Sequence, residues 1–295
     1  MSGPGPAQAE ASLRLERFGA AESFLVAAGP FLERHEAENN LILGLAATLR
    51  DHPQVYPQPP LLALVRDQSG VCLAALRTPP FGLVLSAGPP AAVEVLAAGL
   101  AMAREALPGV AGPTATADHF ARRWRAQTRV AITLEEETEI MQLTGLAQVP
   151  NAPGRVRLAD TADAALLGDW LGAFARERGL STDPARLAAN VERWTAARDR
   201  AMYFWMLGNH PVSLAGVGGA TPHGIKIGPV YTPPAWRGRG YASALVATVC
   251  AAELVSRSFC CLFVDQGNAI ARQLYLRLGF TPVCQIHGYR LESAG

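Results

Sequence analysis

Lysine is almost absent from this sequence of 295 residues. The 26 basic residues include one lysine, Lys226, and are otherwise arginine. Charged residues make up only 17% of the chain, and the net charge is +1. Proteins that bind nucleic acid or anionic membranes through their charge carry a clear basic excess. We therefore expect neither a nucleic acid nor a membrane as a partner.

Cysteine motifs and long apolar runs are also missing. The five cysteines are odd in number, form no CxxC motif and have no accompanying histidine pair. This usage argues against a disulfide scaffold and a structural zinc site, and it is typical of a reducing compartment. The N-terminus lacks the basic segment and apolar run of a secretion signal. No apolar run approaches the roughly 18 residues of a membrane span. Together, these absences predict a cytoplasmic protein without a metal.

Hydrophobic residues, in contrast, make up 49% of the chain, enough for a sizeable core. The length suggests about two domains. The clearest interruption of any periodic pattern lies around Pro150 and Pro153. We therefore predict a flexible tail over residues 1–18, a first domain over 19–152 and a second over 153–295.

The two halves share one order of expected elements: two helices, three strands, and then helix, strand, helix, strand. In the first half, helices are expected at about 20–33, 37–50, 91–106 and 115–125, and strands at 61–66, 71–77, 83–87, Val110 and 129–134. In the second half, helices are expected at about 161–178, 184–198, 240–257 and 268–278, and strands at 202–207, 213–218, 225–232, 259–264 and from Pro282. This shared order indicates an internal duplication.

A glycine-containing loop in the second half has the features of an anion site. A predicted strand ends at Pro233 and Pro234, because two residues without N–H groups cannot continue a sheet ladder. The loop that follows contains Gly238 and Gly240 and leads into a helix. A helix start directs free N–H groups and a positive dipole end toward an anion, and glycine lets a phosphate approach the backbone. Neither a full GxGxxG nor a P-loop motif is present.

A second motif follows on the helix predicted at 268–278. Asn268, Ala271 and Tyr275 are spaced by three and four residues and share one helix face. The small residue at 271 leaves space for a ligand between the amide and the phenol. Asn268 as a helix cap and Tyr275 as an edge of the core are the structural alternatives.

Together the two motifs resemble the GNAT acyltransferase superfamily. Its phosphate loop, Q/R-x-x-G-x-G/A, is matched by Arg237, Gly240 and Ala242, and its second signature, N-x-x-A-x-x-x-Y-x-x-x-G-F, is matched over residues 268–280. The resemblance covers the second half, whereas the first half shares only the element order. It implies an α+β protein of two GNAT-like domains, each a mixed, mostly antiparallel sheet flanked by helices. The first domain would be a degenerate copy, as in the tandem members.

The resemblance also implies roles for individual residues. Acetyl-CoA would bind where two neighbouring strands separate, and Asn268 and Tyr275 would be the catalytic pair, with Tyr275 donating a proton to the departing thiolate. A tyrosine with a pKa of about 10 is protonated at neutral pH and suits that role. The cofactor-binding residues implied are Val230, Tyr231, Thr232, Arg237, Gly238, Arg239, Gly240, Tyr241, Ala242, Ser243, Asn268 and Tyr275.

Several features of the site stay open at this level. Many family members have a glutamate early in the strand before the loop, but residues 221–226 contain no carboxylate, so His223, Asp265 and Glu177 are all candidate bases. Arg272 and Arg277 either contact the 3′-phosphate of CoA or lie in solvent. We expect a small amine or amino-acid-like acceptor, because no charge cluster of one sign marks a polyionic one.

The chain is expected to be a monomer or a homodimer. An acyl-CoA-binding sensor without transfer activity is the alternative to an enzyme. Codon bias explains the scarcity of lysine but not the presence of one at position 226, just before the phosphate loop. Our hypothesis is that Lys226 faces the acceptor or a carboxylate of it, and the alternative is an exposed strand position.

Overall fold

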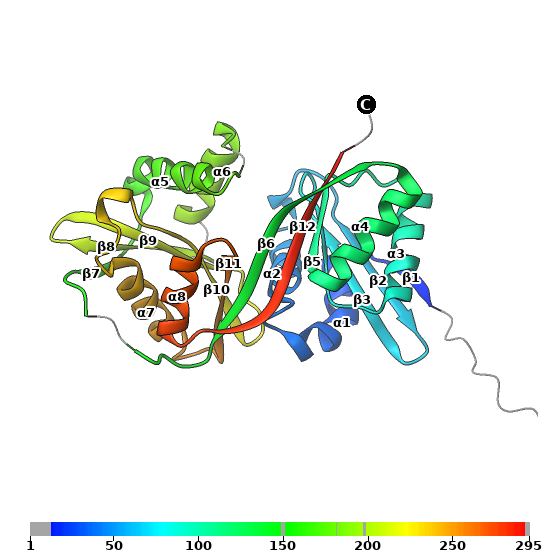
Figure 1. The fold of residues 1–295 in the computed structure, drawn as a ribbon, viewed down its shortest axis with the longest axis horizontal. Helices are drawn as coiled ribbons and strands as arrows, with labels where there is room; N and C mark the ends of the chain where they lie inside the picture. Colours follow the sequence, from blue (N-terminus) through cyan, green and yellow to red (C-terminus); the bar gives the residue numbers. More distant parts are fainter. Residues whose placement is uncertain (1–12, 149–150, 181, 197–198, 293–295) are drawn as a thin grey trace, which may run out of the picture. The chain divides into compact units, whose positions relative to one another are not determined.

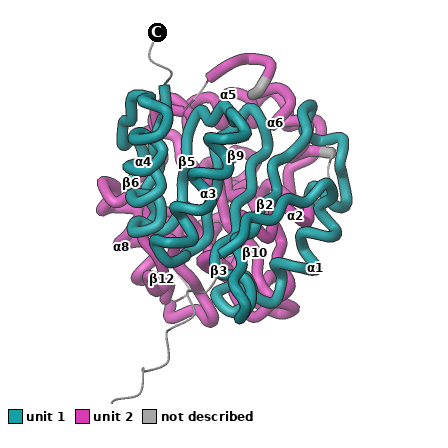
Figure 2. Tube along the Cα trace, turned by 90° about the vertical axis from the view of Figure 1, so that its right-hand side faces the viewer, with its two compact units in different colours: residues 1–35, 48–137, 286–295 teal, residues 36–47, 138–285 magenta. Residues whose placement is uncertain are grey.

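The computed structural model describes residues 13–148, 151–180, 182–196 and 199–292, and it divides into two compact units (Figure 2). Unit 1 contains residues 1–35, 48–137 and 286–295, and unit 2 contains residues 36–47 and 138–285. These units differ from the consecutive halves expected from the sequence. The interruption predicted near residue 152 falls inside unit 2, and its Pro150 lies outside the described residues.

The first copy of the repeat contains ten main elements, which Figure 1 traces from the blue end of the chain. Its helices are α1 (Ala21–Leu32), α2 (Asn40–Asp51), α3 (Pro90–Met102) and α4 (Thr114–Thr128). Its strands are β1 (Arg14–Arg17), β2 (Leu61–Asp67), β3 (Gly70–Arg77), β4 (Leu83–Leu85), β5 (Gly109–Pro113) and β6 (Ala131–Leu143).

The second copy repeats this order. Its helices are α5 (Ala164–Glu177), α6 (Pro184–Ala196), α7 (Tyr241–Glu253) and α8 (Ala269–Leu278). Its strands are β7 (Arg155–Leu158), β8 (Ala201–Leu207), β9 (His210–Gly218), β10 (Gly224–Tyr231), β11 (Phe259–Asp265) and β12 (Thr281–Glu292). The expected elements are therefore all present, although the end of the helix predicted over 184–198 lies outside the described residues.

Each copy also begins with a strand that the sequence did not predict. The flexible tail expected over residues 1–18 is wrong at its end, because β1 pairs antiparallel with β2 from Arg14 opposite Arg66 to Arg17 opposite Ala63. In the second copy, β7 pairs in the same way with β8. Both are edge strands of four residues, two of them arginine, and none of these residues is fully buried, so they carry little of the alternation that marks a half-buried strand.

The sheets confirm the predicted fold class. The strand order in unit 1 is β1-β2-β3-β4-β5-β12, and in unit 2 it is β6-β11-β10-β9-β8-β7. Neighbouring strands pair antiparallel except for β4 with β5 and β10 with β11, which are parallel. Each unit is thus a mixed, mostly antiparallel sheet with helices against it.

The last strands of the two copies are exchanged between the units. In unit 1, β12 pairs with β5 from Ile286 opposite Pro113 to Arg290 opposite Gly109. In unit 2, β6 pairs with β11 from Thr138 opposite Asp265 to Leu143 opposite Cys260. Each sheet is therefore completed by the closing strand of the other copy, which is why the units are not consecutive in sequence.

Two apolar clusters cover the two faces of the unit 2 sheet. One cluster holds Ile225 and Ile227 of β10 with the buried side of α7 and parts of β11 and α8. The other holds Tyr231, at the end of β10, with residues of α5, and α6 contributes Val191. Because successive residues of a strand point to opposite faces, this division assigns each β10 side chain to an α7 side or an α5–α6 side.

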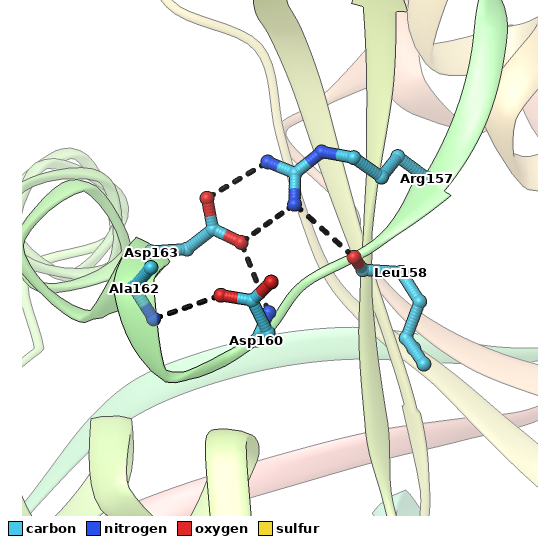
Figure 3. Close-up of polar contacts among 5 residues, drawn as sticks. All are labelled: Arg157, Leu158, Asp160, Ala162 and Asp163. Carbon is cyan, nitrogen blue, oxygen red and sulfur yellow. Dashed lines mark hydrogen bonds and ion pairs between the residues drawn. The ribbon is translucent and has the colours of Figure 1, made fainter.

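Helix α5 is fixed at its N-terminal end by a short polar network (Figure 3). Asp160 and Asp163 form a capping box around the turn that precedes the helix. Arg157 of β7 donates to both carboxylate oxygens of Asp163, at 2.7 and 2.8 Å. This paired ion bridge holds the pKa of Asp163 below its usual value, and it ties α5 to the edge of the sheet. Within the part of the chain that is described, no helix is long and apolar enough to cross a membrane.

Candidate functional site

The candidate site begins where β10 and β11 separate. The registered pairs between these parallel strands run only from Gly224–Phe259 to Lys226–Cys261. Beyond them, β10 stays paired with β9 as far as Tyr231, after an irregularity between Ile227 and Val230. We call the space that opens between β10 and β11 after Lys226 the wedge. Backbone polar groups that face it have lost their neighbouring strand, so the wedge suits a ligand with amide groups.

The loop between β10 and α7 leaves a row of N–H groups at the end of the wedge. Gly238 and Gly240 have φ angles of +74° and +81°, in the left-handed region that disfavours side chains. Gly240 is the N-cap of α7, and no side chain caps this helix. The first backbone bond of α7 runs from Ala244 N to Gly240 O, and no partner among the described residues accepts from the N–H groups over 238–243. This loop has the geometry of a phosphate site.

A cavity of about 490 Å³ lies beside this loop. It is lined by Gln148, Asn151, Gly240, Ser243, Leu274, Arg277 and Leu278. Of the two arginines left open by the sequence, Arg272 donates to Glu139 at 2.9 Å, whereas Arg277 lines the cavity with an exposed guanidinium. Arg277 is therefore a cation available beside the cavity next to the open N–H groups.

Tyr275 lies in the core beneath the wedge. Its side chain is only 8% exposed, and its ring packs edge-on against Phe280 at 5.6 Å between centroids. Burial raises the pKa of Tyr275, with a smaller contribution from Cys250, while Arg178 acts in the opposite direction. The phenol is therefore protonated at neutral pH, and no hydrogen bond to its oxygen occurs within the described structure.

The remaining predicted residues have structural roles that bear on their predicted functions. The Asn268 side chain accepts a hydrogen bond from Ala271 N at 3.0 Å and so caps α8. A helix cap was the structural alternative that the sequence left open for this residue. Val230 packs against the α7 cluster, and Thr232 pairs its hydroxyl with that of Ser213 at 2.8 Å. The contacts of all three with pantetheine stay predictions.

The loop arginines are already partly engaged. Arg237 donates from Nε to Thr232 O at 2.8 Å and from Nη2 to both Glu177 oxygens, at 2.7 and 2.8 Å. Arg239 lies over the ring of Trp236, 5.2 Å from its centroid. The guanidinium of Arg237 thus joins the loop to the end of α5, and its contact with pyrophosphate stays a prediction.

The C-terminal end of α5 lies across the wedge. Glu177 accepts from Arg237 on the β10 side and lies 3.4 Å from the hydroxyl of Tyr231. Its neighbour Arg178 donates to Asp265 at the end of β11, at 2.7 Å. One helix end is therefore connected by ion pairs to the loop after β10 and to the end of β11, and by the Tyr231 hydroxyl to the end of β10.

The three candidate bases are thereby distinguished. Asp265 and Glu177 are both paired with an arginine, so they differ by position and not by pairing. His223 lies at the start of β10, where Glu36 accepts from both its backbone N and its ring, at 2.7 and 2.8 Å. Only Glu177 lies next to Tyr231 at the open end of β10. The sequence did not single out Arg178 or Glu36, because both act through contacts with residues far away in the chain.

Comparisons with known proteins agree with this geometry. Residues 167–280 match the model of the acetyltransferase (GNAT) family. This segment contains the wedge, the loop and α8, so the predicted resemblance is confirmed where the motifs lie. Among proteins of curated function, none matches the sequence.

Solved structures share the fold over nearly the whole chain. A Drosophila protein superposes with a TM-score of 0.67 at 12% identity, covering 95% of this chain and 99% of its own. A GCN5-related N-acetyltransferase from Sphaerobacter thermophilus gives 0.59 at 16% identity, covering 95% of each chain. A tandem GNAT protein from the clavulanic acid biosynthesis pathway gives 0.55 at 13% identity, covering 96% and 99%. At these identities the likeness establishes the fold, which is that of a tandem GNAT protein.

Proposed function

We propose that this protein, an acyltransferase whose second half is a GNAT domain, transfers an acetyl group directly from acetyl-CoA to the amine of a small acceptor. The observation that carries the proposal is the wedge, which opens after Lys226 and ends at the uncapped start of α7. Strands that separate next to an open row of N–H groups suit a ligand with amides in its middle and phosphates at one end.

Binding of the donor would use backbone more than side chains. Val230, Tyr231 and Thr232 would pair with the pantetheine amides along the free edge of β10. The N–H groups over 238–243 would hold the pyrophosphate, with Arg239 adding positive charge. Arg277 and the adjoining cavity would receive the remaining phosphate of CoA.

Tyr275 would act as the general acid. In direct transfer, the amine nitrogen attacks the thioester carbon, the C–S bond breaks, and the thiolate accepts a proton from the phenol. The burial that raises the pKa of Tyr275 keeps its proton in place at neutral pH. A hydroxyl without another partner is also free to donate to the sulfur.

Glu177 would take the proton that the amine loses. Its carboxylate lies at the open end of β10, beside Tyr231, and its neighbour Arg178 acts electrostatically on Tyr275. The ion pair with Arg237 would hold the carboxylate in one orientation, as a base needs.

The five cysteines are free, which supports a reducing, cytoplasmic location. No candidate metal cluster occurs among the described residues, and the proposed transfer requires none. An acyl-CoA sensor without transfer activity remains the second candidate. The unpartnered phenol of Tyr275 favours the enzyme, because binding alone would not need it.

The proposal is tested in two steps. A thermal shift assay compares acetyl-CoA with NAD and ATP, since a ligand at one hundred times its Kd stabilises the fold by about 2.7 kcal/mol. We expect a shift with acetyl-CoA alone, and the absence of a shift with any CoA ester would refute the proposal. Release of free CoA is then screened over amines and amino acids. Binding without release from any acceptor would identify a sensor.

A further inference from the structure

Two cations flank a glycine on the sheet of unit 2. Gly218 of β9 is paired with Lys226 of β10, and Val217 is paired with Ala201 at the start of β8. Arg200, which precedes β8, therefore lies beside Gly218, and a Cβ on that glycine would be 3.0 Å from the Cβ of Arg200. The row across the sheet reads Arg200, Gly218, Lys226, with no side chain between the two cations.

Both cations lie on the α5–α6 side of the sheet. Ile225 and Ile227 pack against α7, so Lys226 between them points to the other face. Trp194 of α6 covers the glycine row there, since its ring would meet a Cβ on Gly216 at 2.8 Å. The guanidinium of Arg200 stacks over the same ring at 5.4 Å. We call Lys226, Arg200 and Trp194 the cationic corner.

The cationic corner has too little negative charge of its own. The group that packs against Lys226 from β11 is Cys261, and burial raises the pKa of that thiol to about 12, so it is neutral at pH 7. Burial lowers the pKa of Lys226, Arg200 and Arg193 of α6 lower it further, and Cys261 acts in the opposite direction, so an anionic ligand beside Lys226 would favour its charged form. Asp199 supplies a carboxylate to Arg200, at 3.2 Å, but no ion pair reaches Lys226 from any described residue.

The position of Lys226 connects this charge to the proposed function. Its pair with Cys261 is the last before the wedge opens, so Lys226 lies at the closed end of the wedge. If the pantetheine arm runs along β10 from the loop, as proposed above, the acetyl group reaches this end. A molecule that approaches it from the α5–α6 side would meet the ammonium of Lys226.

We propose that the cationic corner binds a carboxylate of the acceptor, and that the acceptor is therefore an amino carboxylate, such as an amino acid. This inference rests on the proposed function and deepens it. Lys226 would supply a point charge. Arg200, whose Nε and Nη2 already donate to Asp199 at 3.4 and 3.2 Å, would donate a further hydrogen bond to the carboxylate from Nη1.

The test uses matched acceptors that differ only at the carboxylate. Each set contains an amino acid, its amide and its decarboxylated amine, and both CoA release and calorimetric binding in the presence of free CoA are measured. We expect wild type to prefer the amino acid in at least one set. Lys226→Met is expected to raise KM for that amino acid by roughly 10- to 100-fold, the scale of a charged hydrogen bond, with little change for the amide.

Variants separate this role from a structural one. Lys226→Arg is expected to restore most of the preference, and Arg200→Gln to reduce it. Arg290→Gln, which removes an exposed arginine paired with Glu135 in unit 1, serves as the control and is expected to change nothing. A Lys226→Met variant that loses kcat equally for amino acid and amide, with an altered pH profile, would overturn the proposal in favour of a base.

Other outcomes have equally clear meanings. Wild type that favours amines or amides, or that neither binds nor acetylates any amino carboxylate, overturns the inference. Calorimetry with acetyl-CoA is run on the same samples. If wild type binds acetyl-CoA in that experiment, the proposed function stands even when the inference fails. If wild type does not bind acetyl-CoA, the proposed function itself is refuted.

Discussion

Replacing Gly240 by alanine separates the folding role of the phosphate loop from its binding role. Gly240 has a φ of +81°, and the atom nearest to an added Cβ is the Cβ of Ala152 at 3.9 Å, an ordinary contact. The substitution therefore brings no clash. Its cost to the fold is the left-handed conformation alone, about 1–2 kcal/mol of unfolding free energy.

The same methyl group has a larger effect on the bound state. It stands on the N-cap of α7, where a pyrophosphate would contact the backbone N–H groups. A hydrogen bond to a charged group contributes about 1.5–3 kcal/mol, so loss of one or two such bonds costs about 3 kcal/mol. We expect the Kd for acetyl-CoA to rise roughly 100-fold.

Gly208→Ala is the matched control. Gly208 has a φ of +60° in the turn between β8 and β9, and an added Cβ there meets nothing within 4 Å. Both variants should lose similar stability in urea unfolding, but only Gly240→Ala should lose affinity in calorimetry. Equal affinities for acetyl-CoA in the two variants would refute the assignment of this loop to phosphate.

Three further predictions concern the acid, a buried carboxylate and the first copy. Tyr275→Phe should lower kcat roughly 100-fold without changing acetyl-CoA affinity, and near-normal turnover would remove the phenol from the mechanism. Glu36→Gln should destabilise the fold by about 1–3 kcal/mol at pH 7. Although desolvation opposes ionisation, hydrogen bonds from Thr221 and His223 lower the pKa of Glu36 below 4.5. The stabilisation by ionised Glu36 should therefore be present above pH 4.5 and be lost as the pH falls through the native pKa. A difference in unfolding free energy between variant and wild type that persists below the native pKa would contradict this. Finally, calorimetry should give one acetyl-CoA per chain, because α3 begins at Pro90 after Pro89, and neither residue has an N–H for a phosphate. Two sites would show that the first copy also binds.

The parts of the site that could be predicted from sequence are local. The loop over 237–242 and the spacing of Asn268 and Tyr275 depend on residues close together in the chain, where helical periodicity and glycine chemistry act directly. The same is true of the main helices and buried strands. Edge strands such as β1 could not be predicted, since three exposed charged residues and one partly buried leucine carry too short a periodic signal.

Contacts between residues far apart in the sequence could not be predicted from local patterns. The sequence indicated Arg237 as a cofactor-binding residue, but it could not show that its guanidinium pairs with Glu177, which lies on another helix. The sequence likewise suggested that Lys226 faces the acceptor, but it gave no second cation. Its neighbour Arg200 becomes visible only through the register of β8, β9 and β10, because strand pairing, not sequence distance, brings the two cations to one row.

The exchange of closing strands makes the first copy part of the active unit. Strand β6 comes from the first copy, yet its residues 138–143 complete the unit 2 sheet beside β11. From β6, the nearly buried Glu139 pairs with Arg272 at 2.9 Å and so holds α8, the helix that carries Tyr275. A chain that began at residue 153 would leave β11 as an open edge and α8 without this partner. The degenerate copy therefore contributes to the site through its last strand, although the family match begins only at residue 167.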